Sequence, residues 1–554
     1  MISESENLRR REANYRPLTP IHFLLRSADV FPDRVAVIDG ARSFTWRQYA
    51  DRCLRLASAL RRRGIAKGDT VAVLAPNTSA MLEAHFGIPM AGAVICALNV
   101  RLDASTLAFI LGHSETKILL ANRQFADLAR QAVAMTKISL EVIGIDDPEA
   151  PEGEIADWTE YESFLETGDA ADSIVWPDDE WDSIALNYTS GTTGNPKGAV
   201  YHHRGTYLNS LGQLLTFGIG SAPVYLWTLP MFHCNGWCFV WAIAAAGGTH
   251  VCLRRAAADT IFDAISRYDV THMCCAPTVL NFVVEGAEAS GARLPRPVEV
   301  MTAGAAPPAA VLRATEALGF RIRHVYGMVE MHGVIASCDW HPEWDDLPAE
   351  ERARIRARQG VRTVLCDDMK VLDAKTFMPV PADGRTMGEV MMRGSVTMKG
   401  YFKNPSATDE ALAGGWYHSG DLAIVHLDGY IELRDRSKDI IISGGENISS
   451  IEIEDVLYSH PAVSCAAVIA IAHQRWGEVP CAFVELKPSY EGRVTADEIV
   501  EFCRGRMAKF KVPGTVKFGA IERTAKGEGP EVQTSRRGDG RSAIGTFQEM
   551  EKWR

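Results

Sequence analysis

The sequence predicts an α/β fold with a large N-terminal domain and a small C-terminal domain. Between about residues 70 and 304, short β-rich runs alternate with helical stretches, which is typical of parallel sheets covered by helices. From about residue 360 the pattern changes to short strands separated by turns, which indicates a β-rich subdomain. A compact α+β pattern follows residue 440, so we expect the domain boundary at 434–440.

The individual segments support this organisation in order. In the larger domain we expect strands at TVAVLAP (70–76), VICAL (94–98), KILLAN (117–122), IALNY (184–188), THVCLRR (249–255) and VEVMTAG (298–304). The helical stretches among them include DASTLAFILGH (103–113) and part of TIFDAISRYDVTHMCCAP (260–277). The subdomain strands are expected at TVLCDD (363–368), GEVMMRG (388–394) and GYIELRD (429–435). In the small domain, helices at SIEIEDVLYSH (450–460) and TADEIVEFCRGRMAKF (495–510) flank strands at SCAAVIAIA (464–472) and PCAFVELKP (480–488).

Composition excludes several classes of protein. The chain has 554 residues and a formal net charge of −12, which argues against a nucleic-acid partner. The most apolar stretch, 80–100, carries Glu83 and His85, so we expect a core helix and no integral membrane association. The first residues, MISESENLRRREANY, lack the apolar core of a secretory signal. The cysteines show no zinc-site spacing, so we expect buried, reduced thiols in a cytoplasmic protein.

The strongest chemical motif is YTSGTTGNPKG, which runs from Tyr188 to Gly198 directly after an expected strand. Its glycines, which include Gly191 and Gly194, allow the backbone to fold around phosphate oxygens. A nucleoside-triphosphate P-loop needs Ser or Thr after its Gly-Lys pair, whereas Lys197 lies between proline and glycine here. The hydroxyls and the lysine add phosphate-binding groups, and a flexible surface hairpin would rarely combine them: Thr189, Ser190, Thr192, Thr193 and Lys197.

This motif resembles the signature of the adenylate-forming enzymes, which include acyl-CoA synthetases, peptide-synthetase adenylation domains and beetle luciferases. The resemblance covers about residues 20–525 and several separate motifs. It implies that ATP and Mg²⁺ bind at the loop, and that a mobile C-terminal domain rotates between two half-reactions. By this resemblance 1–434 is the AMP-binding domain, 435–439 the hinge and 440–525 the C-terminal domain.

Two further motifs, MTAGAAP (301–307) and HVYGMVE (324–330), match the family. The family has threonine where this chain has Val329, so we expect the loss of one phosphate hydrogen bond, worth about 0.5–3 kcal/mol. Glu330 alone would be an ordinary surface carboxylate, but by resemblance it binds Mg²⁺ together with Thr189, and Mg²⁺ prefers a carboxylate plus phosphate oxygens. The resemblance assigns the nucleotide and acyl contacts to Met301, Gly304, Ala305, Ala306, Tyr326, Gly327, Met328 and Val329.

The stretch GWYHSGDLAIVHLDGYIELRDRSKD (415–439) carries the expected ribose site. By resemblance Asp421 accepts hydrogen bonds from both ribose hydroxyls, which suits a carboxylate because it offers two acceptor oxygens. Arg436 supports the same sugar, and Lys438 occupies the hinge with a catalytic role. Without the resemblance these residues would be a turn residue, a solvated strand end and an exposed lysine.

The acyl and CoA contacts are expected in two more segments. In LPMFHCNGW (229–237), His233 matches the family histidine that flanks the acyl-adenylate. Trp237, Phe239 and Met301 supply an apolar wall that fits an aliphatic acid. In SGGENIS (443–449), the expected contacts on the nucleotide or CoA side come from Gly444, Gly445 and Glu446. The same segment also fits a glycine turn before a capped helix.

These motifs imply an ATP-dependent acid–CoA ligase of fatty acid and lipid metabolism. A short- to medium-chain carboxylate attacks the α-phosphate of MgATP, and the CoA thiol then displaces AMP from the acyl-adenylate. LNVRLDASTLAFILGH and HPEWDDLPAEERARIRARQGV most resemble bacterial short- to medium-chain ligases, including 3-methylmercaptopropionyl-CoA ligases. An adenylation-impaired remnant that binds nucleotide and a luciferase-like oxygenase are the alternatives, and a homodimer is left open.

The tail ERTAKGEGPEVQTSRR (522–537) has neither strand alternation nor a helical stripe. The family's essential lysine falls on Glu528, which would repel the α-phosphate, and Lys526 is two residues early. A one-base insertion near codon 528 is our hypothesis. Deleting one base from permitted codons for 526–536 gives Lys-Gly-Lys-Val-Gln-Lys-Phe-Lys-Leu-Arg, which is the family tail. We expect 526–554 to be frameshifted and disordered, with simple divergence as the alternative.

Overall fold

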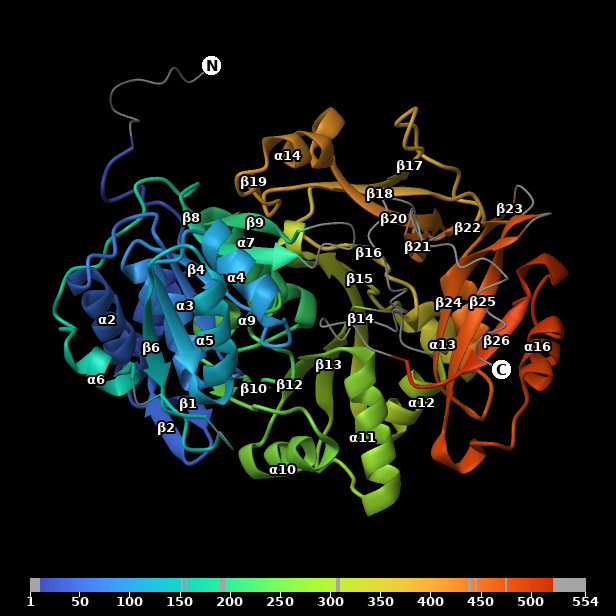
Figure 1. Cartoon of the computed structure of the whole chain (residues 1–554), viewed down its shortest axis with the longest axis horizontal. Helices are drawn as coiled ribbons and strands as arrows, with labels where there is room; N and C mark the ends of the chain where they lie inside the picture. Colours follow the sequence, from blue (N-terminus) through green and yellow to red (C-terminus); the bar gives the residue numbers. More distant parts are fainter. Residues whose placement is uncertain are drawn as a thin grey trace.

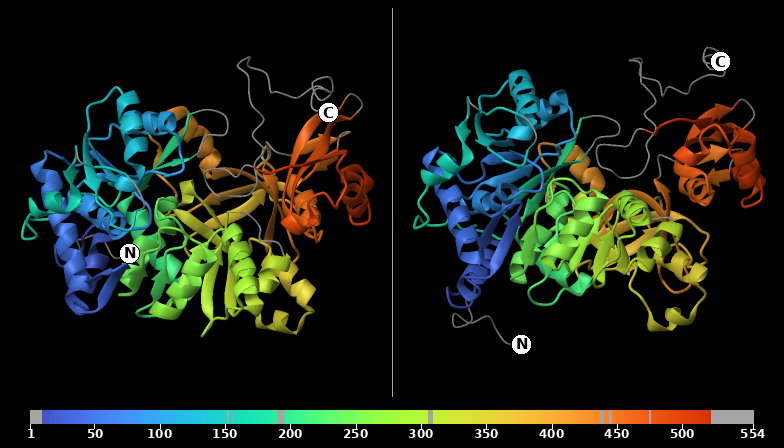
Figure 2. Two further views of the ribbon diagram at one scale, coloured as in Figure 1. Left: turned by 60° about the horizontal axis from the view of Figure 1, so that its bottom comes forward. Right: turned by 90° about the horizontal axis from the view of Figure 1, so that it is seen from below.

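The computed structural model describes residues 10–150, 153–155, 157–189, 195–304, 309–436, 440–443, 446–473 and 476–521. Parallel sheets covered by helices make up the N-terminal part of the chain, and a β-rich subdomain and a small α+β unit follow (Figure 1). The predicted α/β fold class is therefore confirmed. In both views of Figure 2 the C-terminal elements lie at the opposite side of the molecule from the N-terminal sheet.

The first sheet is mainly parallel and runs in the order β19–β9–β8–β4–β3–β5–β6–β7. Val71 and Val73 pack with the central core on one face, while Ala72 and Leu74 pack on the other with α4 and α5. This two-sided burial explains why the strand is an unbroken apolar run. The strands are β3 (Thr70–Leu74), β4 (Val94–Ala97), β5 (Ile118–Asn122), β6 (Glu141–Ile145), β7 (Thr159–Glu160), β8 (Ser183–Thr189), β9 (Lys197–His202) and β19 (Gly400–Tyr401).

The second sheet runs in the order β16–β15–β14–β13–β12–β10–β11–β1–β2. Its central strands from β1 to β14 are parallel, and β15 and β16 add an antiparallel edge. The strands are β1 (Val35–Asp39), β2 (Arg42–Thr45), β10 (Val224–Leu226), β11 (Thr249–Val251), β12 (His272–Cys275), β13 (Val298–Thr302), β14 (Phe320–Met328), β15 (Gly333–Ser337) and β16 (Val361–Arg362).

Helices cover both sheets, and many begin at a residue that caps them. Thr45 and Gln48 form a capping box at α2, and Asp103 accepts from the first turn of α4. The helices are α1 (Ile21–Val30), α2 (Trp46–Arg62), α3 (Ser79–Met90), α4 (Ala104–His113), α5 (Ala126–Met135), α6 (Tyr161–Glu166), α7 (His203–Phe217), α8 (Cys234–Trp237), α9 (Phe239–Ala245), α10 (Ala258–Tyr268), α11 (Pro277–Ser290), α12 (Ala309–Ala317), α13 (Ala349–Arg356) and α14 (Pro405–Ala411). Short 3₁₀ turns are Arg123–Phe125, Val329–Met331, Pro342–Asp346, Ala413–Gly415, Pro488–Tyr490 and Lys509–Lys511.

The β-rich subdomain is an antiparallel sheet in the order β17–β18–β20–β21. Its strands are β17 (Asp368–Leu372), β18 (Gly388–Arg393), β20 (Tyr417–Val425) and β21 (Ile431–Arg436). The strand expected at TVLCDD (363–368) is wrong, because this segment is a turn in which Cys366 N donates to Thr363 O at 3.1 Å. Val364 is exposed, whereas Leu365 and Cys366 pack against the central core, so the apolar run reaches the core from a turn.

The C-terminal elements form a sheet in the order β23–β22–β25–β24, with β26 paired to β25. Its strands are β22 (Ile441–Ser443), β23 (Glu446–Ile448), β24 (Val463–His473), β25 (Gly477–Leu486) and β26 (Thr515–Phe518), and its helices are α15 (Ser450–Tyr458) and α16 (Ala496–Arg504). The backbone N–H of Ser450 donates to Asp435 Oδ2 at 2.7 Å, which fixes the start of α15 beside β21. The position of the domain boundary, 434–440, remains a prediction.

Candidate functional site

The expected phosphate loop connects two antiparallel strands. β8 ends at Thr189 and β9 begins at Lys197, and these two residues are direct partners in the strand register. Lys197 is exposed, and its Nζ lies 5.0 Å from the centre of the Tyr401 ring. The Lys197 ammonium is thus held over an aromatic face, which favours a cation. The rest of the expected loop lies outside the described residues: Ser190, Gly191, Thr192, Thr193 and Gly194.

A buried polar chain joins this strand to the segment that carries His233. Asn187, two residues before Thr189, donates from Nδ2 to Asn235 Oδ1 at 2.6 Å. Asn235 Nδ2 lies 3.0 Å from His85 Nε2, and His85 Nδ1 lies 2.7 Å from Met81 O. A carbonyl oxygen only accepts, so Nδ1 of His85 carries the proton and Nε2 accepts from Asn235. The chain therefore ties the two segments together through side-chain hydrogen bonds, and within the described residues it leaves Oδ1 of Asn187 buried without a partner.

The segment after His233 is a left-handed turn. Every residue from Cys234 to Cys238 has a positive φ, between 43° and 65°, and non-glycine residues adopt this conformation at a cost. Asn235 and Gly236 are the residue types that tolerate it best. Trp237 lies in this turn and packs against the central core. Its expected place beside the acyl group remains a prediction.

The residues of HVYGMVE lie where β14 ends. Glu330 is 9% exposed, and its Oε1 accepts a hydrogen bond from Tyr401 Oη at 2.7 Å. Its backbone oxygen accepts from Met398 N at 2.8 Å, and the backbone oxygen of Val329 accepts from Tyr201 Oη at 2.6 Å. Two strands, β9 and β19, and Met398 in the loop before β19 therefore hold this short segment in place. The surface position that Glu330 alone would suggest does not apply.

The expected ribose site joins β14 to the β-rich subdomain. Tyr326 Oη donates to Asp421 Oδ2 at 2.6 Å. Asp421 lies in β20, where Arg436 of β21 is its partner in the strand register. The backbone N–H of Asp421 donates to Ser419 Oγ at 3.0 Å. The structure thus brings Tyr326 to Asp421, which lies 95 positions later, and pairs the backbone of Asp421 with that of Arg436.

The remaining predicted residues divide into two groups. Met301 is fully buried in β13, and Gly304, three residues later, has a φ of +97°. Met328 ends β14, and Gly327 is needed there because a Cβ would lie 1.9 Å from the Gly333 carbonyl oxygen. Glu446 begins β23. The others lie outside the described residues: Ala305, Ala306, Lys438, Gly444, Gly445 and the tail after Lys526, including Glu528.

The donor set near Glu330 fits a magnesium ion that arrives with a nucleotide. Within the described residues, no three His, Cys, Asp or Glu side chains gather to hold a metal. A protein cage is therefore not present there. Mg²⁺ in nucleotide enzymes uses one or two carboxylates and completes its shell with phosphate oxygens and water, which matches a single carboxylate beside a phosphate loop.

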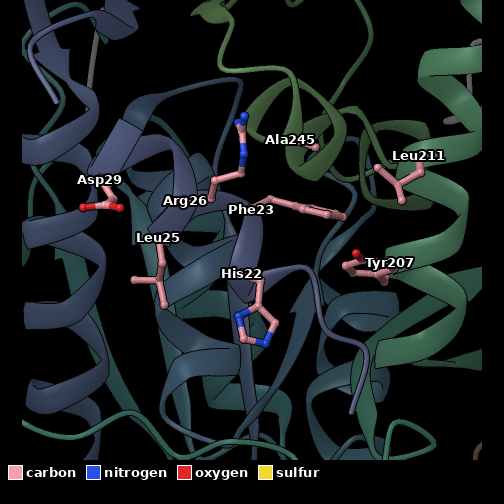
Figure 3. Close-up of a pocket in the computed structure, with 8 residues that line it drawn as sticks. All are labelled: His22, Phe23, Leu25, Arg26, Asp29, Tyr207, Leu211 and Ala245. Carbon is pink, nitrogen blue, oxygen red and sulfur yellow. The ribbon is translucent and has the colours of Figure 1, made fainter. Parts of the chain in front are cut away.

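A surface pocket lies away from all these residues. It has a volume of about 580 Å³ and is formed by α1, α7 and α9 (Figure 3). Phe23 and Tyr207 stack across it with ring centres 4.6 Å apart. None of the predicted site residues lines it.

Sequence reasoning missed Tyr401, Tyr201, Asn187 and Asn235. No motif marks Tyr401, which lies about 70 residues after Glu330 in an ordinary GYF stretch. For Asn235 there was a signal, because an Asn-Gly pair predicts a turn with positive φ, and this one lies two residues after His233 in FHCNGW.

Comparisons with known proteins identify the family. The AMP-binding enzyme family matches residues 24–402, and the AMP-binding enzyme C-terminal domain matches 452–528. The chain is 50% identical over 539 residues to the acetate–CoA ligase CCL3 of Humulus lupulus, covering 94% of this chain and 95% of that protein. It is also 50% identical over 544 residues to the peroxisomal acetate/butyrate–CoA ligase AAE7 of Arabidopsis thaliana, with the same two coverages, 94% and 95%.

A solved structure gives the same result. The o-succinylbenzoate-CoA synthetase MenE of Bacillus subtilis, in complex with its acyl-adenylate intermediate, matches with a TM-score of 0.78 at 26% identity. The match covers 93% of this chain and 99% of that chain. Its complex with ATP and a magnesium ion matches with a TM-score of 0.76 at 27% identity, over 91% and 97% of the two chains. The chain therefore belongs to the AMP-binding enzyme family of adenylate-forming enzymes.

Proposed function

We propose that this protein is an ATP-dependent acid–CoA ligase that activates a short aliphatic carboxylate. The observation that carries the proposal is the 50% identity, over nearly the whole of both chains, to ligases named for acetate and butyrate. The medium-chain acids that the sequence motifs also suggested form the upper part of the range to be tested. The two relatives at 50% identity are named as CoA ligases, which favours the ligase over the luciferase-like alternative.

The chemistry needs an activated acyl group, because a carboxylate has no adequate leaving group. The carboxylate oxygen attacks the α-phosphorus of ATP, the bond to the β-phosphate oxygen breaks, and pyrophosphate leaves. The CoA thiol then attacks the acyl carbon and AMP leaves with the bonding electrons. The task of the protein is therefore to position charged groups and to stabilise charge on the phosphates.

The proposed roles of the residues follow from their positions. Lys197 contacts the phosphates from the start of β9, and Glu330 holds Mg²⁺ beside them, with Thr189 as a further oxygen ligand. When bound, Mg²⁺ neutralises phosphate charge. Asp421 accepts from the ribose hydroxyls, with Tyr326 and Arg436 beside it. His233 and Trp237 border the acyl group, together with Met301.

The second half-reaction is proposed to use the C-terminal domain. Lys438 provides the hinge, and Gly444, Gly445 and Glu446 contact the nucleotide or CoA side. These roles rest on the family resemblance. The proposal also includes a cytoplasmic location, supported by cysteines that are all free and mostly buried in the described part of the chain. No described helix is long and apolar enough to cross a bilayer.

The test is product formation from a mixture of acids. The purified chain is incubated with ATP, Mg²⁺, CoA and equimolar C2 to C10 acids plus benzoate, and acyl-CoA products are quantified by mass spectrometry. We expect acetyl-, propionyl- or butyryl-CoA to dominate. Dominant benzoyl- or decanoyl-CoA would contradict the proposed substrate class while leaving the ligase reaction intact. A parallel reaction supplied with synthetic butyryl-adenylate and CoA shows whether thioester formation occurs when adenylation is bypassed.

A further inference from the structure

Tyr401 contacts two of the proposed site residues at once. Its Oη donates to Glu330 Oε1 at 2.7 Å, and its ring lies 5.0 Å from Lys197 Nζ. Lys197 and Glu330 belong to motifs more than 130 residues apart in the sequence. Among the contacts of the described residues, Tyr401 is thus a direct bridge between the phosphate-loop cation and the proposed magnesium carboxylate.

The backbone of Tyr401 is fixed on both sides. β19 pairs with β9, placing Tyr401 opposite Ala199 and only two residues from Lys197 in the register. The next residue, Phe402, donates from its backbone N–H to Gly198 O at 2.7 Å, and Tyr401 N donates to Thr408 Oγ1 at 2.9 Å. A side chain on such a strand holds its contacts with little reorganisation.

The Tyr401 hydroxyl is the donor in its bond to Glu330, because an ionised carboxylate only accepts hydrogen bonds. A protonated phenol donates to one carboxylate oxygen, and a carboxylate retains acceptor capacity for a cation when one of its oxygens accepts such a bond.

We propose that Tyr401 is a positioning residue that orients Glu330 toward Mg²⁺ and holds Lys197 for the phosphates of ATP. This inference rests on the proposed function. The hydroxyl and the ring of Tyr401 then have separate effects on ATP binding. The hydroxyl acts on the metal through Glu330, and the ring acts on the phosphate charge through Lys197 by a cation–π contact.

Equilibrium binding of ATP separates these two effects. Without a carboxylic acid no adenylate forms, so the Kd for ATP is measured by calorimetry in Mg²⁺ and again in EDTA. For Tyr401→Phe we expect the tightening of ATP binding by Mg²⁺ to fall by about tenfold, the effect of losing a hydrogen bond to a charged group. The Kd in EDTA is expected to stay unchanged. For Tyr401→Leu we expect the Kd in EDTA to rise as well, because the aromatic ring is lost.

Two further variants control this experiment. Tyr430→Phe removes a comparable hydroxyl that donates to Asp339 O at 2.7 Å, away from the site residues, and should leave both Kd values unchanged. Combining Tyr401→Phe with Glu330→Gln should add little to the effect of Glu330→Gln alone, because both changes act through one carboxylate. A thermal melt of each variant checks that it is folded.

The outcomes distinguish the inference from the proposed function. If the unmodified chain binds ATP more tightly with Mg²⁺ but Tyr401→Phe keeps that full tightening, the positioning role is refuted and the proposed function survives. Additive effects in the double variant refute the role in the same way. If the unmodified chain does not bind ATP in either buffer, the proposed function fails and the inference fails with it.

Discussion

The hydroxyl of Tyr326 lies 2.6 Å from Oδ2 of Asp421, and this contact joins β14 of a parallel sheet to β20 of the β-rich subdomain. The two residues are 95 positions apart. Because the contact fixes one oxygen of the carboxylate, Asp421 has a defined orientation beside Arg436, its partner in the strand register. The proposed ribose site is thus assembled by the packing of two separate units.

Asp421→Asn tests this site. The amide keeps the shape of the carboxylate but replaces one acceptor oxygen with a donor and removes the charge. We expect ATP binding to weaken by about 1.5–3 kcal/mol, or roughly tenfold to a hundredfold in Kd. Tyr326→Phe should have a smaller effect in the same direction. The exposed turn residue Asp373, changed to Asn, is a matched control, and equal effects of Asp421→Asn and Asp373→Asn would contradict the assignment.

The left-handed turn after His233 makes Asn235 a test of backbone strain. Asn235→Gly removes the amide that pairs Asn187 and His85, and we expect a loss of about 1–3 kcal/mol from unpaired buried groups. Asn235→Ala removes the same amide but keeps a Cβ at a φ of +44°, which costs about 1–2 kcal/mol relative to the glycine variant. Thermal melting should rank the chains in the order Asn, Gly, Ala. An Ala variant as stable as the Gly variant would show that the strain is absent.

Buried histidine makes stability depend on pH. Burial lowers the pKa of His85 to about 4 from its ordinary value of 6.5. The unfolded chain binds this proton below about pH 6.5 and the folded chain only below about pH 4. The stability that neutral His85 contributes is therefore full above pH 6.5 and is lost as the pH falls toward 4.

His85→Gln reports this effect directly. Within that window the slope of stability against pH should decrease by about 1.4 kcal/mol per pH unit, the value for one proton. The variant should keep part of its dependence of stability on pH, because burial also lowers the pKa values of His203 and His250 to about 3. The measurement is the apparent Tm between pH 4.5 and 7.5. Parallel curves for the variant and the unmodified chain would contradict the account.

The residue at position 528 is expected to limit adenylation. By the family resemblance the essential lysine falls on Glu528, and a carboxylate there would oppose the charge that develops on the α-phosphate. Glu528→Lys should raise pyrophosphate–ATP exchange by about 10²- to 10³-fold, the range for one charge-stabilising group. Thioester formation from supplied acyl-adenylate should not change. No gain in exchange would mean that a lysine at position 528 does not restore adenylation. The frameshift hypothesis has a separate test, because the codons of the gene show whether the shift in reading frame is permitted.

The sequence predicted the elements of the fold better than the contacts between them. The strand within 70–76 was predictable because it is buried on both faces and is continuously apolar from Val71 to Leu74. The segment 363–368 also has consecutive apolar residues, Val364 to Cys366, but Val364 faces solvent, and only the packing of neighbouring strands decides that. Pattern alone cannot separate these two cases.

The candidate site could likewise be predicted from the sequence only in part. Motifs indicated Asp421, Glu330 and Lys197 singly, because phosphate and ribose chemistry requires those residue types. The side chains that orient them, Tyr326 and Tyr401, lie on strands far away in the sequence, and their contacts arise from sheet packing. Tyr326 was expected as a nucleotide contact, and its bond to Asp421 appears only in the structure.

The central claim is that this chain forms an acyl-adenylate from a short aliphatic acid. Pyrophosphate–ATP exchange on the unmodified chain tests it most directly, with acetate, propionate, butyrate and longer acids supplied in turn. Synthetic butyryl-adenylate plus CoA serves as the control for a folded second half-reaction. The account predicts exchange that depends on a short acid, at a rate that Glu528→Lys raises. Absence of acid-dependent exchange in both the unmodified chain and the Glu528→Lys variant, with thioester still formed from the supplied adenylate, would contradict it.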